Sequence, residues 1–168
     1  MNELYRDIEA QIPRLRRYAR ALLGDHTRAD DLVQDTLERA LSRLHLWRRG
    51  SDLRAWLFSI MHSIYVNEVR RSQRWARVVM DGAELDPSLA AHQDEPLALH
   101  DMLSALARLP DEFRAVVLLV GLEEMSYKEA AGVLGIPVGT VMSRLARGRE
   151  RLRALMSGER PPALRRVK

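Results

Sequence analysis

The chain has 168 residues, no cysteine and a formal net charge of +4, and 46% of its residues are hydrophobic. The missing cysteine excludes a disulfide scaffold, a thiolate zinc site and a cysteine nucleophile within the chain. The N-terminal residues lack the apolar stretch of a signal peptide. The longest apolar run, from Ala115 to Val120, is far shorter than the roughly 20 residues of a membrane span. We therefore expect a cytoplasmic protein.

Charge is unevenly distributed along the chain. Residues 1–72 hold 13 Lys and Arg against 10 Asp and Glu, and residues 102–168 hold 12 against 7. The segment between them, residues 73–101, holds 2 Lys and Arg against 6 Asp and Glu. Two basic blocks around an acidic segment favour binding to a polyanion such as nucleic acid, although a solvated helix surface would give the same counts.

Three amphipathic helices are predicted in the first half of the chain, where apolar residues recur at spacings of three and four. Their approximate ranges are 8–23, 27–44 and 53–74. Gly24 is placed to end the first helix, and Thr27 offers an N-cap to the second. The third helix is expected to be largely buried, with Trp56 and Leu57 in the core.

Helical periodicity weakens after Arg77 and resumes at Leu97. The segment between them contains two prolines and scattered acids, so we predict a flexible acidic linker. Pro110-Asp111-Glu112 then marks a new helix start, because proline suits the first turn and acids suit the positive end of the helix dipole. From Gly158 onward we expect a frayed tail. The predicted fold is all-α, with two small helical domains joined by the linker.

The segment from Ser126 to Arg153 carries a helix-turn-helix signature. Ser126 and Glu129 have the spacing of a capping box, and Gly135 stands where the tight turn needs a positive φ. Val141 is apolar, as docking of the second helix on the first requires. That helix would present four polar side chains outward: Thr140, Ser143, Arg144 and Arg147. Such a face can read base edges in the major groove, whereas a solvated Arg-rich helix is the alternative.

Four separated motifs occur together in the chain: DDLVQDTL at 30–37, LRAWLFSI at 53–60, LPDEFR at 109–114 and YKEAA at 127–131. In this order and spacing they resemble the extracytoplasmic-function (ECF) sigma factors of bacterial RNA polymerase, over about residues 10–157. The resemblance implies a protein that directs core RNA polymerase to specific promoters and assists promoter melting. It also implies how the chain is divided.

Residues 1–77 would form sigma region 2, which binds core polymerase and the −10 promoter element. Residues 97–157 would form sigma region 4, which binds the −35 element through its helix-turn-helix. Residues 78–96 would be the linker, and residues 158–168 a basic tail. The acidic stretch from Asp81 to Asp101 would thread the polymerase cleft, where its charge imitates nucleic acid.

The resemblance also implies three sets of binding residues. The β′ clamp helices of core polymerase would bind a polar face of the second helix: Asp31, Gln34, Asp35, Glu38 and Arg39. The melted −10 strand would be held by a mixture of aromatic, amide and basic side chains, which suits a single strand: Tyr65, Asn67, Arg70, Arg71 and Arg74. The −35 duplex would be read from the helix-turn-helix: Lys128, Thr140, Ser143, Arg144, Arg147 and Arg151. Trp75 and Arg77 belong to the same stretch, and packing explains Tyr65 and Trp75 equally well when each is taken alone.

Further expectations concern partners and specificity. Ser63 and Asn67 stand where relatives commonly carry Asn and Asp, so the preferred −10 bases should differ from the family's usual set. The β flap of polymerase would contact the apolar surface of the second domain. A separate anti-sigma factor is expected because the C-terminal extension is short, and a membrane-bound one would hold the protein at the inner membrane. We expect no cofactor, no metal and no small-molecule substrate.

Two other classes of protein are open alternatives. An autonomous helix-turn-helix regulator would dimerise or bind a ligand, and would bind duplex operator tightly without polymerase. An enzyme would need a reactive constellation, but the five histidines are scattered and the sequence shows neither a Gly-rich phosphate loop nor metal-ligand spacing. We therefore expect no catalytic residue.

Overall fold

The computed structural model describes residues 2–79 and 96–158, and all regular structure within these ranges is helical. The elements are α1 (Asn2–Leu23), α2 (His26–Ser42), η1 (Leu44–Leu46), α3 (Leu53–Val79), α4 (Leu97–Ala107), α5 (Asp111–Val117), η2 (Leu118–Leu122), α6 (Tyr127–Leu134) and α7 (Val138–Ser157). The short η1 is a 3-10 turn, whereas η2 is a π-helix that continues α5. Within the described ranges, none of the helices combines the length and the hydropathy that a membrane span needs. The all-α fold is confirmed.

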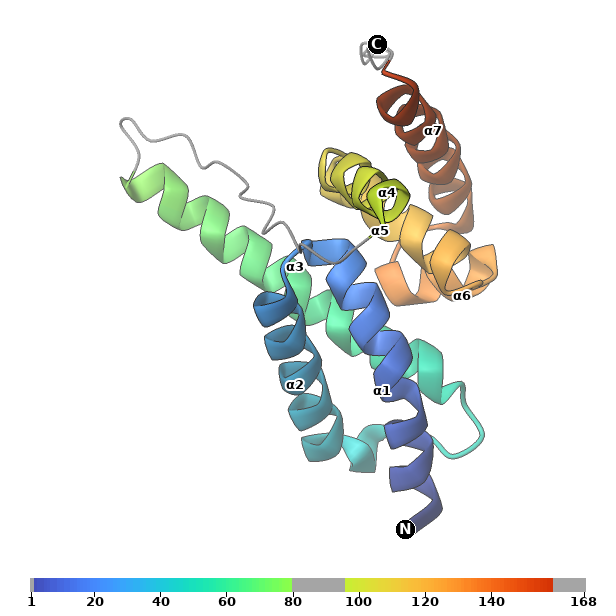
Figure 1. The fold of residues 1–168 in the computed structure, drawn as a ribbon. Helices are drawn as coiled ribbons and strands as arrows, with labels where there is room; N and C mark the ends of the chain where they lie inside the picture. The colour runs from blue at the N-terminus through green and yellow to red at the C-terminus, as the bar shows by residue number, and fades with distance from the viewer. Residues whose placement is uncertain (1, 80–95, 159–168) are drawn as a thin grey trace.

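Helices α1, α2 and α3 form the first helical unit (Figure 1). Helix α1 runs antiparallel to α2, and α3 crosses behind both of them. Fully buried side chains from all three helices fill the space between them: Leu15, Tyr18, Leu22, Leu32, Leu57, Phe58 and Met61. The rings of Tyr18 and Phe58 meet edge-on, with centroids 5.2 Å apart. The predicted burial of Leu57 is confirmed, and Trp56 is half-buried against the same core.

Local capping chemistry decides where α1 ends and α2 begins. Gly24 adopts a φ of 67° directly after α1, as predicted. The N-cap of α2 is Asp25, whose carboxylate accepts a hydrogen bond from the Arg28 N–H at 3.1 Å. The prediction of Thr27 as the cap was wrong. Aspartate is at least as good an N-cap as threonine, and it comes first in the chain, so Thr27 lies inside the first turn.

Helix α3 is longer than predicted. It begins with Asp52 as a cap, since the Ala55 N–H donates to the Asp52 carboxylate at 3.1 Å, and it continues past Arg74 to Val79. No glycine or proline stands between Arg74 and Val79 to stop it. The C-terminal half of α3 projects beyond the rest of the first unit (Figure 1), so its side chains are largely exposed.

Helices α4 to α7 form the second unit, and the predicted helix-turn-helix is confirmed in α6 and α7. The Ser126 hydroxyl accepts from the Glu129 N–H at 3.1 Å, and the Glu129 carboxylate accepts from the Ser126 N–H at 2.7 Å. This reciprocal capping box starts α6, and Gly135, with a φ of 64°, ends it. Val141 of α7 is fully buried, so it docks the second helix as expected.

Helix α7 crosses α5 at Gly148. A Cβ atom at this position would lie 2.7 Å from Cγ2 of Val117 and 3.3 Å from Cβ of Phe113. Because β-branched valine is stiff, we expect Gly148→Ala to lower the free energy of unfolding by about 1–3 kcal/mol, as measured by urea denaturation. Gly132→Ala, at a helical position with open space around it, should stabilise by up to about 1 kcal/mol. Equal stability of Gly148→Ala and wild type would contradict this packing.

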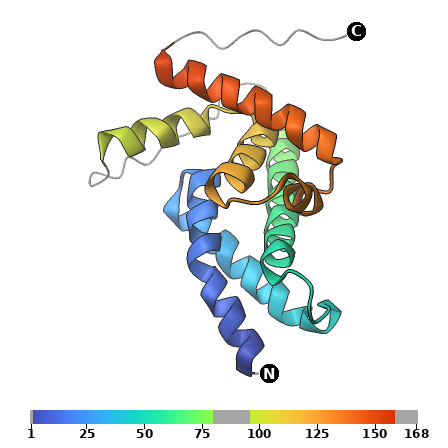
Figure 2. The ribbon, with the colours of Figure 1, turned by 90° about the vertical axis from the view of Figure 1, so that its right-hand side faces the viewer.

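The two units pack against each other, which the sequence does not predict. Helix α6 lies against α3, and α1 touches both α4 and η2. Figure 2 shows α7 lying across the far end of the second unit, away from α1 and α2. Buried apolar side chains form one continuous hydrophobic cluster through both units, from Leu15 in α1 to Leu145 in α7. We call this arrangement of the two units the closed form.

Candidate polymerase and nucleic-acid interfaces

The outer face of α2 carries the five predicted core-binding residues. Asp31, Gln34, Asp35 and Glu38 are exposed, and Arg39 is half-buried. The Gln34 side-chain amide donates to the Glu38 carboxylate at 3.0 Å, one turn along the helix. The closed form therefore leaves a continuous acidic face on α2 accessible to a partner.

A groove of about 490 Å³ lies between α2 and α3. It is lined by Asp35, Arg39, Ile64, Asn67, Glu68, Arg71, Arg74 and Trp75. The groove thus brings three of the predicted −10 residues next to two of the predicted core-binding residues. Trp75 is 63% exposed, so its ring is available for stacking. Trp75 stands in the aromatic and basic stretch that is predicted to suit a single strand, and its exposure excludes the alternative of packing in the core.

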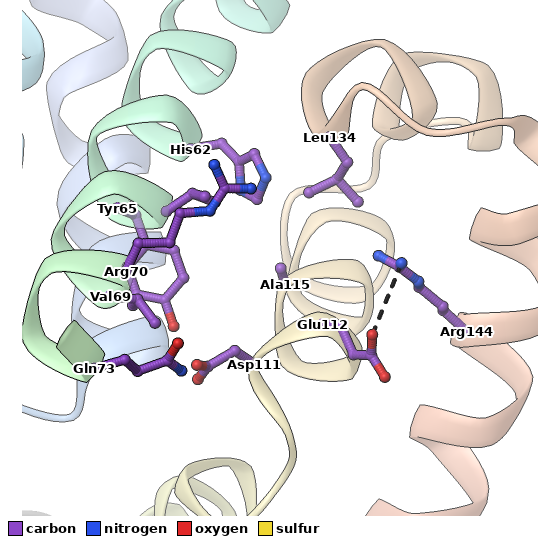
Figure 3. Close-up of a pocket in the computed structure, with 11 residues that line it drawn as sticks. His62, Tyr65, Val69, Arg70, Gln73, Asp111, Glu112, Ala115, Leu134 and Arg144 are labelled. Carbon is purple, nitrogen blue, oxygen red and sulfur yellow. Dashed lines mark ion pairs between the residues drawn. The ribbon is translucent and has the colours of Figure 1, made fainter. Parts of the chain in front are cut away.

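Tyr65 and Arg70 line a different cavity, a pocket of about 410 Å³ between α3 and the second unit (Figure 3). Tyr65 is only 4% exposed, and burial raises the pKa of its hydroxyl well above the usual range. In the closed form Tyr65 is therefore a packing residue. Contact between Tyr65 and a DNA base requires the two units to separate.

The far wall of this pocket belongs to the second unit. Arg144 of α7 points into it and pairs with Glu112 at 3.8 Å (Figure 3). His62 lies on the α3 side, and its Nδ1 is buried without a hydrogen-bond partner. Burial, together with the positive charge of Arg144, lowers the pKa of His62 below its usual value. The pocket therefore joins predicted −10 and −35 residues across the interface between the units.

The other predicted −35 residues differ in their exposure. Lys128, Ser143 and Arg147 are exposed, and Thr140 is half-buried, with its carbonyl accepting from the Ser143 hydroxyl at 3.1 Å. Arg151 is held differently, because its guanidinium lies 5.2 Å from the centroid of the Phe113 ring. Lys128, Ser143 and Arg147 are thus the exposed members of the predicted −35 set.

Polar contacts between the units were missed by sequence reasoning. Arg17 pairs with Glu123, Arg54 pairs with Glu129, and Arg114 donates to the carbonyl of Leu22. The partners are 75 or more positions apart in the chain, so no local spacing rule finds them. The one sequence feature that points to such a contact is Glu123, a charged residue directly after the apolar run of η2.

Comparisons with known proteins agree with this architecture. The family model described as the Sigma2 domain of PhyR matches residues 8–62, and the model for sigma-70 region 4 matches residues 99–152. The ECF RNA polymerase sigma factor EcfG of Rhodopseudomonas palustris is 39% identical over 155 residues, covering 89% of this chain and 83% of EcfG. SigE of Mycolicibacterium smegmatis is 34% identical over 148 residues, covering 83% of this chain and 56% of SigE.

Two solved structures extend the likeness to the arrangement of the helices. The sigma factor RpoE from Bartonella quintana, in complex with the anti-sigma factor NepR, gives a TM-score of 0.84 at 34% identity, over 95% of this chain and 100% of that chain. CnrH, in complex with the cytosolic domain of CnrY, gives a TM-score of 0.65 at 30% identity, over 93% of this chain and 91% of CnrH.

Two helical units, the second with a helix-turn-helix, define a two-domain DNA-binding protein of the transcription machinery. The relatives identify its family: the chain belongs to the ECF sigma factors of bacterial RNA polymerase, which are promoter-directing subunits and are not known as enzymes.

Proposed function

We propose that the protein directs core RNA polymerase to specific promoters and assists opening of the −10 duplex. The observation that carries the proposal is the grouping of its exposed surfaces. An acidic face on α2 adjoins a groove with basic, amide and aromatic side chains, and a helix-turn-helix presents Ser143 and Arg147 from the second unit. These are the surfaces needed for a protein partner, a single strand and a duplex, respectively.

We assign residues 1–77 to region 2 and residues 97–157 to region 4. The matched ranges 8–62 and 99–152 lie within these bounds and support the assignments. Most of the linker at 78–96 and nearly all of the tail at 158–168 lie outside the described residues. So do the acids from Asp81 to Glu95 that would thread the polymerase cleft, and their role in imitating nucleic acid stays a prediction.

The groove between α2 and α3 is the proposed site for the melted −10 strand. Arg71 and Arg74 can follow the phosphates, the Asn67 amide can both donate to and accept from a base edge, and Trp75 can stack on a base. Trapping unstacked bases offsets part of the cost of opening the duplex. Ser63 is exposed one turn before Asn67, and we propose that this pair shifts the preferred −10 bases.

The outer face of α7 is the proposed −35 reader. Arg147 can pair with guanine and Ser143 can reach a phosphate or a base edge in the major groove. Arg149 and Arg153 are also exposed and suit the backbone phosphates. Arg144 completes this face once it leaves the pocket between the units. The apolar surface of region 4 is the proposed contact for the β flap.

We also propose an anti-sigma factor as the regulatory partner. RpoE and CnrH were each solved in complex with a partner, NepR and the cytosolic domain of CnrY. Their similarity to this chain favours a partner of the same class here. The proposed location is the cytoplasm, where core polymerase works, and a membrane-bound anti-sigma factor would hold the protein at the inner membrane.

Run-off transcription tests the proposal. Core polymerase and sheared genomic DNA should yield discrete new transcripts with a shared upstream sequence when the protein is added. Arg147→Ala should reduce initiation at these promoters about 5- to 150-fold, since a lost base contact costs about 1–3 kcal/mol. Its binding to core polymerase should be unchanged, which separates DNA reading from assembly. Absence of both new transcripts and core binding would favour an autonomous regulator instead.

A further inference from the structure

Two arginines of the first unit bind one short segment of the second. Arg17 of α1 donates to the Glu123 carboxylate at 3.0 and 3.2 Å and to the Leu122 carbonyl at 3.3 Å. Arg54 of α3 donates to the Glu123 carbonyl and to the Glu129 carboxylate, both at 3.2 Å. The carbonyls at the C-terminal end of η2, which lack partners within the helix, are therefore satisfied by cations from the other unit.

Glu123 makes the contact between the two units sensitive to the loss of its cation. Its carboxylate is fully buried, and its Oε2 has no hydrogen-bond partner. Arg17 supplies the ion pair for that carboxylate, and its own side chain is 51% exposed. A buried carboxylate that loses its cation is strongly disfavoured, but separation of the units would return it to water. Loss of Arg17 therefore destabilises the closed form relative to a separated one.

Promoter geometry requires that separated form. Arg70, predicted to bind the −10 strand, and Arg144, predicted to read the −35 duplex, line the same pocket of about 410 Å³. The two promoter elements are named for positions about 25 base pairs apart, which is roughly 85 Å along B-form DNA. The closed form cannot place both residues on their elements together. Tyr65 is buried in the same interface and becomes accessible only on opening.

We propose that Arg17, Arg54, Glu123 and Glu129 form a latch that holds the free protein in the closed form, in which Tyr65 is buried and Arg144 is turned into the pocket between the units. The proposed core-binding face of α2 stays exposed in this form, so the closed protein can dock on core polymerase before it opens. This proposal rests on the proposed function for its biological meaning. The latch itself is a property of the free protein and is testable without polymerase or DNA.

Distance measurements by single-molecule fluorescence test the latch directly. The chain has no cysteine, so Ser42→Cys in the first unit and Met156→Cys in the second, both exposed, give one label site in each. Wild type should be mainly closed. Arg17→Ala and Arg54→Ala should each raise the ratio of open to closed molecules about ten-fold. The matched control is Arg16→Ala, because Arg16 neighbours Arg17 but pairs with Asp30 inside the first unit.

A second readout uses a labelled duplex that carries a −35 element identified by transcription. The apparent affinity of the free protein should rise with the fraction of open molecules in the two latch variants, and stay at the wild-type value in Arg16→Ala. Wild-type distance distributions in both latch variants would overturn the latch, even if transcription by wild type succeeds. Failed transcription with opened latch variants would instead refute the proposed function and leave the latch standing.

Discussion

Arg114→Met should lower the free energy of unfolding by about 3 kcal/mol or more, because the mutation leaves several carbonyls without a donor. The guanidinium donates to the carbonyls of Leu106, Ala107, Leu109 and Leu22 at 2.7, 2.9, 2.7 and 3.1 Å. It thereby caps the end of α4 and ties that end to the end of α1. Urea denaturation followed by circular dichroism measures the loss.

Two further variants sharpen this test. Arg114→Lys should recover little of the lost stability, since an ammonium group cannot reproduce the planar fork that reaches separate carbonyls. Arg108→Met is the matched control, because Arg108 is exposed at the C-cap of α4, the helix end that Arg114 caps. Its free energy of unfolding should change by less than about 0.5 kcal/mol. A normal stability for Arg114→Met would show that water replaces the guanidinium at no cost.

The double variant Asp31→Lys/Asp35→Lys should weaken binding to core polymerase by roughly 100-fold, which corresponds to about 2.7 kcal/mol. Both carboxylates are exposed on the acidic face of α2, so reversing them replaces attraction to a basic partner with repulsion. Fluorescence anisotropy with labelled protein and core polymerase measures the affinity. The circular dichroism spectrum should match that of wild type.

A charge-matched control separates a docked face from general attraction. Asp7→Lys/Glu9→Lys changes the net charge by the same amount at two exposed positions of α1. This control should bind core polymerase with nearly the wild-type affinity. If both double variants lose affinity equally, binding depends on the overall charge of the protein and the assignment of the α2 face fails.

The parts of the structure that could be predicted depend on local chemistry. The capping box at Ser126, the positive φ of Gly135 and the burial of Val141 each follow from neighbours within a few positions. The exposed face around Asp35 follows in the same way from helical periodicity. Local rules still compete, and at the start of α2 the cap at Asp25 prevailed over the expected Thr27.

The parts that could not be predicted depend on distant contacts. The pairing of Arg17 with Glu123 spans 106 positions, and the sequence contains no pattern that relates them. The π-helix η2 lies in an apolar run, so its wider i→i+5 turns leave no periodic pattern in the sequence. The burial of Tyr65 follows from contact between the units, so its role could not be separated from packing by sequence alone.

The hydrophobic cluster shared by the two units has a consequence for the lifetime of the protein in the cell. When the units separate without polymerase, apolar surface that the closed form buries is exposed to water. An opened, unbound molecule is then the form that proteases and aggregation remove first. We therefore expect closure to protect copies that await polymerase, so that they persist longer than a variant held open by mutation.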